Sequence, residues 1–445
     1  MTRDRTRATS VLSTVTALIR LVLIVVCILA VVALATGGSD LLDRLPGRGV
    51  AGDDWAEANV VFTRDGATPQ QRRQLRSRLQ AQLAHHATLS IRFMRATVTG
   101  DPGFVDAAND VLVRNVDELR VTLEPAIGEK PAERFSAQWS ETTQQLFAYA
   151  QALRDDDDAA RQGAREELDR SVATLAEVLS EATGGELAVD LARTKLQMQT
   201  DLLLFQIDAY DGHDHSQAYQ LEREAFANMY PLGAAIAAAA TGRNPAATGT
   251  PPREEIASTL AMLLDEHVEL SIDTVRAGTN GAPEFAAAAA ALDANTADLR
   301  RTMATLLGAR RARVFNQRWS RHIDLLMRYT VAVAEGDLTA RTTLQRQLDD
   351  TMRGFGPALA KATGGRVGRR MVSNAMTAHE FAMIDHISAY VATDYERAHD
   401  TAYDAYSHMN QTAHRIGRAL GRSVEAGLPQ GGAATGGGGM AAPVR

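Results

Sequence analysis

Apolar residues recur at helical spacing through nearly all of residues 70 to 422, whereas no sustained alternation typical of a β-strand occurs there. Short breaks rich in Gly, Asp and Pro divide this stretch into two sets of six helices, each helix of about 20 to 28 residues. One such helix fills the interval between Gly336 and Gly364. Because short connections make successive helices antiparallel neighbours, the pattern predicts an all-α protein with two tandem antiparallel helical bundles.

The two sets of helices are copies of one pattern. Residues 86–230 return in residues 267–410 at an offset of 181 positions, which becomes 180 after one deleted residue. Trp139 thus corresponds to Trp319. This internal duplication predicts one bundle over residues 70–241 and a second over residues 253–422, with a linker rich in proline and glycine between them.

A separate apolar run extends from residue 11 to residue 35, and Arg20 is its single charge. The run is long enough to cross a hydrocarbon core of about 30 Å. Because Arg3, Arg5 and Arg7 precede it, the positive-inside rule places the N-terminus in the cytoplasm and the rest of the chain outside the cell membrane.

These features predict a cytoplasmic N-terminus and membrane anchor in residues 1–37 and a linker in residues 38–69, together with a disordered, glycine-rich tail in residues 423–445. A cleaved signal peptide is the alternative to the anchor, since Ala33-Leu34-Ala35 resembles a cleavage site. The single cysteine, Cys27, lies in the apolar run, so neither a disulfide framework nor a multi-cysteine metal site can form within one chain.

Charge and motif content narrow the function. The net charge is −7, and no basic stripe is interleaved with aromatic residues, so nucleic acid is not expected as a partner. The sequence holds no nucleophile elbow, phosphate-binding glycine loop, HExxH motif or paired Glu-x-x-His motif. We therefore expect a protein that is not an enzyme.

Histidines distinguish the second copy from the first. Four of them each lie near the middle of a different predicted helix of the second copy: His267, His322, His379 and His408. The first copy has His86 at the first of these positions and Thr142, Gln199 and Asn228 at the others. Because mid-helix positions of an antiparallel bundle meet at one level, we expect the four imidazoles to converge in its interior.

Convergent imidazoles are typical of a transition-metal site, and we predict that these four histidines bind copper or zinc. Additional candidate ligands lie nearby in the sequence: Met376, Met383, His386 and Met409. Glu266 and Asp404 are candidate acceptors for a ring N–H. Two alternatives remain: histidines that lie separately at interfaces or on the surface without a metal, and a haem or other planar ligand between the helices.

Both copies, over roughly residues 70 to 420, resemble a group of uncharacterised extracytoplasmic helical proteins of Gram-positive bacteria. Members of that group share a six-helix plan with HVxWT-like, RNxxDI-like, LLxxHI-like and HLxxT-like motifs and a His-containing last helix. The matching segments are residues 267–271, 114–119, 321–323, 379–381 and 407–409. The resemblance implies the fold and the location, and no reaction. A more distant resemblance is to the four-helix sensor ectodomains of bacterial chemoreceptors and sensor kinases.

The sequence thus favours a membrane-anchored extracytoplasmic helical-bundle protein that binds a metal ion or a small cofactor in its second copy. The alternative is a non-catalytic structural, partner-binding or sensor-like ectodomain without a metal. No feature of the sequence identifies a protein partner.

Overall fold

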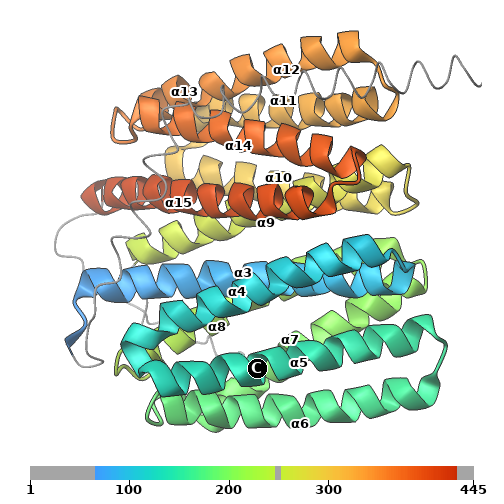
Figure 1. Cartoon of the computed structure of the whole chain (residues 1–445). Helices are drawn as coiled ribbons and strands as arrows, with labels where there is room; N and C mark the ends of the chain where they lie inside the picture. Colours follow the sequence, from blue (N-terminus) through green and yellow to red (C-terminus); the bar gives the residue numbers. More distant parts are fainter. Residues whose placement is uncertain (1–65, 246–251, 428–445) are drawn as a thin grey trace, which may run out of the picture. The chain divides into compact units, whose positions relative to one another are not determined.

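The computed structural model describes residues 66–245 and 252–427, and its elements in these ranges are all α-helices (Figure 1). The all-α prediction is therefore confirmed. The first repeat comprises α3 (Pro69–Thr99), α4 (Pro102–Ile127), α5 (Glu129–Arg154), α6 (Asp158–Ala182), α7 (Val189–Asp211) and α8 (His215–Ala240). The second comprises α9 (Pro252–Asn280), α10 (Phe285–Leu307), α11 (Ala309–Ala334), α12 (Leu338–Arg353), α13 (Phe355–Ala362), α14 (Arg369–Val391) and α15 (Tyr395–Gly427).

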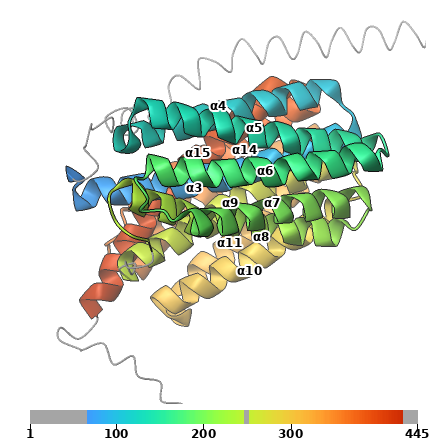
Figure 2. The same cartoon turned by 90° about the horizontal axis from the view of Figure 1, so that it is seen from below.

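Helix bounds in the second repeat follow the register read from the sequence. From α5 to α7, each bound reappears 180 residues later, as the pairs 129–154 with 309–334 and 189–211 with 369–391 show. Within each repeat, these helices pack lengthwise against one another, and Figures 1 and 2 show the two sets apart from each other. The equal bounds are what an internal duplication would produce.

The fourth helix of the second repeat departs from the prediction of one continuous helix. It is broken at Gly354 into α12 and α13, whereas α6 is unbroken. Pro357 has no N–H to donate to the carbonyl of Arg353, and the hydroxyl of Ser373 donates to that carbonyl instead, at 2.8 Å. A Cβ on Gly354 would lie 1.9 Å from the Arg318 guanidinium, so the break also makes room for that side chain.

The predicted membrane span lies outside the described residues, as does most of the predicted linker. No helix within residues 66–245 and 252–427 has both the length and the apolar character needed to cross a membrane. The predicted tail began at residue 423, but α15 continues to Gly427 and only the rest of the tail lies outside the described residues.

The turn after the fourth helix is built in the same way in both repeats. Thr183 accepts a hydrogen bond from the backbone N–H of Leu187 at 3.3 Å, and Thr363 accepts one from Val367 at 3.2 Å. Two glycines with positive φ follow each threonine, at 61° and 84° in the first repeat and 61° and 82° in the second. Glycine adopts this left-handed backbone without steric cost, which explains the paired Thr-Gly-Gly sequences.

The first helix of each repeat, α3 or α9, is buried almost all round over its C-terminal two thirds. Such burial is typical of a central helix. Each of these helices packs along the last helix of its own repeat, and the two also contact each other. The described residues of both repeats belong to one compact unit.

Charged side chains are buried where α3 and α9 meet. Arg92 of α3 donates from Nε to Asp273 of α9 at 2.7 Å and from Nη2 to the carbonyl of Glu269 at 2.9 Å, and its Nη1 lies 2.5 Å from Oε2 of Glu269. Arg95 lies 3.0 Å from Glu222 of α8. The inter-repeat cluster is defined as Arg92, Arg95, Glu222, Glu269, Asp273 and Arg276.

Protonation within the inter-repeat cluster reflects its burial. Burial raises the pKa of Glu222 to about 8, although Arg95 opposes this, and Asp273 raises it further. Burial likewise raises the pKa of Glu269 to about 7 against the effect of Arg92. Burial also opposes ionisation of Asp273, but Arg92 and Arg95 outweigh it and lower the pKa of that carboxyl. The arginines therefore hold a carboxylate inside the protein that would otherwise be protonated.

Candidate metal centre

Three of the four predicted histidines meet in the interior of the second repeat. His267 comes from α9, His322 from α11 and His379 from α14, and each is at most 1% exposed. Their ring centroids are 5.6 Å apart for His267 and His322, 6.0 Å for His267 and His379, and 6.1 Å for His322 and His379. One ring nitrogen of each lies within 4.8 Å of the other two. We call these three side chains the histidine triad.

All six ring nitrogens of the histidine triad lack a hydrogen-bond partner among the described residues. Trp319 Nε1, whose ring centroid is 4.6 Å from that of His267, lacks one too. Buried polar atoms are nearly always hydrogen-bonded, and an unsatisfied one costs about 1 to 3 kcal/mol. A neutral imidazole offers one lone pair and one N–H, and the indole of Trp319 offers an N–H, so both donors and acceptors are left without a hydrogen bond here.

Glu380 is a further member of the site that sequence reasoning did not single out. It is 3% exposed, and its Oε2 lies 3.3 Å from Nδ1 of His322. Neither carboxylate oxygen has a hydrogen bond of good geometry within the described residues. A signal was present in the sequence: the first repeat has Thr200 at this position, so the second repeat differs by a carboxylate as well as by histidines.

Burial keeps two members of the histidine triad, His267 and His379, in the neutral form. It holds the pKa of His267 well below its ordinary value, and the neighbouring His322 and His379 lower it further. Burial lowers the pKa of His379 to about 3, with further lowering from His322 and His408. A neutral imidazole has a free lone pair, which is the form that binds a metal ion.

His408 of α15 is half-buried, and the structure does not bring it into the group whose nitrogens lie within 4.8 Å. Its effect on the pKa of His379 shows that the two lie near each other. Met376 and Met409 line a cavity of about 20 Å³ beside Trp319, among apolar residues. Met383 is fully buried within the hydrophobic core.

His386 belongs to a different environment from the histidine triad. Its Nε2 accepts from Nε of Arg276 at 3.2 Å, and its Nδ1 lies 2.7 Å from the carbonyl of Ala398. Both ring nitrogens therefore have partners, and the ring lies beside the inter-repeat cluster. A second level of metal ligands at His386 is not what the structure shows.

The predicted acceptors for ring N–H groups also have other roles. Glu266 accepts from Nε of Arg223 at 3.0 Å and from Nδ2 of Asn295 at 2.6 Å. Asp404 is 61% exposed and lies 3.8 Å from Arg114. Glu266 is next to His267 in the sequence, but the two side chains leave α9 in different directions, so being adjacent does not bring the carboxylate to the ring.

The equivalent region of the first repeat is closed by hydrogen bonds. Trp139 donates to Nε2 of His86 at 2.8 Å, and Nδ1 of His86 lies 3.0 Å from Oδ1 of Asn115. Thr142 is hydrogen-bonded to Ser171 at 2.7 Å. In addition, Asn228 donates to Gln199 at 2.9 Å. At these positions the side chains of the first repeat therefore bond to one another, although Nε2 of Gln199 has no hydrogen-bond partner among the described residues.

Comparison with known proteins identifies no relative of this chain. No family model matches the chain, and neither a curated protein nor a solved structure matches it.

Proposed function

We propose that the second repeat binds one transition-metal ion through His267, His322 and His379. The observation that carries this proposal is the meeting of three buried imidazoles whose ring nitrogens form no hydrogen bond with the described residues. Around a tetrahedral ion with metal–nitrogen bonds of about 2.0 to 2.1 Å, ligand atoms lie roughly 3.3 Å apart. The present separations, within 4.8 Å, need small side-chain movements to reach that geometry.

Zinc suits this set of ligands better than Cu(I). Glu380 supplies a carboxylate, either as a fourth ligand or as the acceptor that orients His322, and carboxylates are hard ligands. The thioethers of Met376 and Met409, which would favour Cu(I), face an apolar cavity instead. Cu(II) is the second candidate, because imidazole binds it well.

Binding without catalysis is the role that fits the surroundings. The triad histidines are at most 1% exposed, and the neighbouring cavity beside Trp319, which they do not line, has a volume of about 20 Å³, room for one water molecule rather than for a substrate or a haem. We therefore propose a metal-binding or metal-stabilised protein that is not an enzyme. A purely structural or partner-binding bundle without a metal is the outcome if the following test fails.

Full-length protein incubated with zinc and then desalted should retain about one zinc ion per chain by elemental analysis. His379→Gln and His322→Thr, which introduce the residues of the first repeat, should each reduce the retained zinc to background. His408→Asn is the matched control and should keep most of it, since His408 lies outside the triad. A wild-type protein that retains neither zinc nor copper, or a His379→Gln protein that retains as much, contradicts the proposal.

We also propose that the chain is anchored in the membrane by residues 11–35, with both repeats outside the cytoplasm. The support is the apolar run and the three arginines that precede it. Protease added to intact cells should then digest the repeats, as seen by immunoblotting with an antibody against α6. Full protection in intact cells, with digestion after lysis, would show the opposite orientation.

A further inference from the structure

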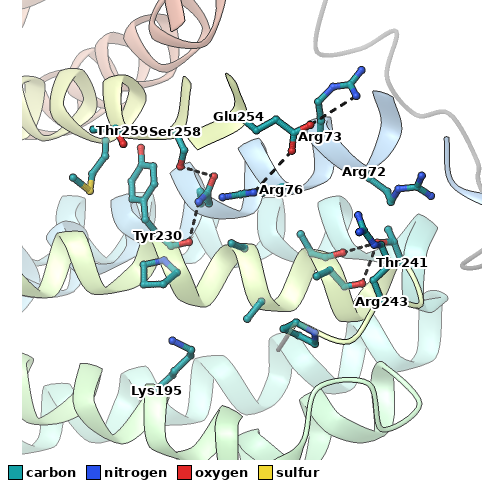
Figure 3. Close-up of a pocket in the computed structure, with 18 of the residues that line it drawn as sticks. Arg72, Arg73, Arg76, Lys195, Tyr230, Thr241, Arg243, Glu254, Ser258 and Thr259 are labelled. Atoms are coloured by element: carbon teal, nitrogen blue, oxygen red, sulfur yellow. Dashed lines mark hydrogen bonds and ion pairs between the residues drawn. The ribbon is translucent and has the colours of Figure 1, made fainter. Parts of the chain in front are cut away.

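A cleft of about 770 Å³ lies at one end of the first repeat, between α3, α7, α8 and the start of α9 (Figure 3). This volume is in the range of small-molecule sites, which is about 300 to 1,000 Å³. None of the residues lining the cleft belongs to the histidine triad or to the inter-repeat cluster. An inference about it therefore does not depend on the proposed metal site.

The cleft is hollow because α8 presents short side chains to it. Ala234, Ala235, Ala237 and Ala238 line one wall, where longer side chains would fill the space. The second repeat has His414 at the position of Ala234, and that side chain is buried. The open volume is thus a feature of the first repeat's own sequence.

Close packing holds the floor of the cleft in place. Nε2 of Gln80 on α3 donates to the carbonyl of Tyr230 on α8 at 3.0 Å, and the hydroxyl of Ser258 on α9 donates to Oε1 of Gln80 at 3.1 Å. A Cβ on Gly233 would lie 2.7 Å from the backbone nitrogen of Gln80, so α3 and α8 approach each other closely at this point. A site whose walls are fixed in this way loses little entropy on binding.

Positive charge exceeds negative charge around the cleft. Glu254 is the single acidic residue among the lining residues. Five lining residues are basic: Arg72, Arg73, Arg76, Lys195 and Arg243. Glu254 lies 3.9 Å from Arg73 and 4.0 Å from Arg76, so one carboxylate serves two guanidinium groups. Lys195 and Arg243 form no ion pair within the described residues.

The basic side chains lie on more than one side of the cleft. Figure 3 shows Lys195 on the side opposite Arg73 and Glu254, with Tyr230 between them. Leu191, Pro231 and Met262 add apolar surface to the alanines of α8. A ligand that binds both the basic side chains and the apolar wall needs an anionic group and an apolar body.

We infer that this cleft binds an amphiphile with an acidic head group, a carboxylate or a phosphate, on a fatty-acyl type of chain. The head group lies between Lys195 and the arginines of α3, and the chain covers the alanines of α8. A free inorganic anion would leave the apolar wall in water, and a neutral lipid would offer no negative charge to Lys195 and Arg243.

The test uses full-length protein in phosphatidylcholine nanodiscs, with empty nanodiscs subtracted. Binding of radiolabelled dodecanoate and of dodecyl phosphate is compared with that of dodecanol and inorganic phosphate. Saturable binding of one or both anionic amphiphiles, at least tenfold tighter than that of dodecanol, is expected. The preferred head group then distinguishes a fatty acid from a lipid phosphate as the source. Inorganic phosphate that binds as tightly as dodecyl phosphate, or no saturable binding at all, overturns the inference.

Two kinds of variant localise the binding. Lys195→Gln with Arg243→Gln should weaken binding of the anionic amphiphiles about tenfold, because charge-assisted hydrogen bonds are lost. Ala234→Leu should reduce it at least as much by filling the cleft. Arg134→Gln, an exposed arginine on α5, is the matched control and should bind like the wild type. Unchanged binding by the charge variant overturns the assignment even if Ala234→Leu fails to fold.

Discussion

Replacing Arg92 by alanine is expected to lower the free energy of unfolding by about 3 to 5 kcal/mol, which is the usual cost of removing one partner from a buried ion pair. Arg92 is 5% exposed and contacts both Asp273 and Glu269 of the other repeat. Without it, the Asp273 carboxylate would stay buried with less compensating charge. Urea unfolding followed by circular dichroism measures the effect.

Arg134→Ala is the matched control for the Arg92 variant. Arg134 also lies 2.9 Å from a carboxylate on a neighbouring helix, that of Glu181, but both side chains are more than 60% exposed. Exposed pairs contribute about 0 to 1 kcal/mol, so this variant should unfold close to the wild type. Equal losses in the two variants would show that the inter-repeat cluster contributes no more than a surface pair.

The positions of the helices could be predicted from the sequence because the duplication repeats each turn between helices, so that each boundary could be located in two copies. Where Thr183 and Thr363 precede paired glycines, both copies give the same turn, and the structure has it in both. The break at Gly354 was missed because it occurs in one copy, inside an otherwise helical pattern. Pro357 was the one signal in the sequence, because it cannot donate to the carbonyl of Arg353, whereas the packing of Arg318 and the hydrogen bond from Ser373 cannot be inferred from periodicity.

The inter-repeat cluster was not anticipated, for a related reason. Five of its six charged residues lie on α3 or α9, which are buried almost all round, so that an apolar stripe no longer marks the inner face. Arg92 and Asp273 even occupy equivalent positions in the two repeats, at an offset of 181. Each charge alone resembles a solvated position, and only the packing of α3 on α9 shows that they neutralise each other.

Three members of the candidate metal centre followed from one geometric idea, that mid-helix positions meet at one level. His267, His322 and His379 do meet in this way. The level of a residue along its helix does not say in which direction around the helix axis its side chain points. It therefore could not separate His408, which is half-buried, from the triad. It also gave no reason to select Glu380, whose carboxylate reaches the site from the residue next to His379.

Saturating zinc is expected to stabilise the wild-type protein by about 4 kcal/mol at a free concentration 1,000 times the dissociation constant, since an ion that binds only the folded state shifts unfolding by mass action. The gain should be large because the metal-free site contains six unpartnered ring nitrogens, and the ion would bind three of them. Urea unfolding with zinc and then with excess chelator measures it, and the chelator should reverse the gain.

His379→Gln should abolish this zinc-dependent gain, while its stability in chelator should be equal to or higher than that of the wild type in chelator. The second expectation follows from the first repeat, where Gln199 at the same position accepts a hydrogen bond from Asn228 at 2.9 Å. His408→Asn would complete that pair in the second repeat, so the double variant His379→Gln/His408→Asn should be the most stable without metal. A zinc-dependent gain that persists undiminished in this double variant would contradict a site that requires His379.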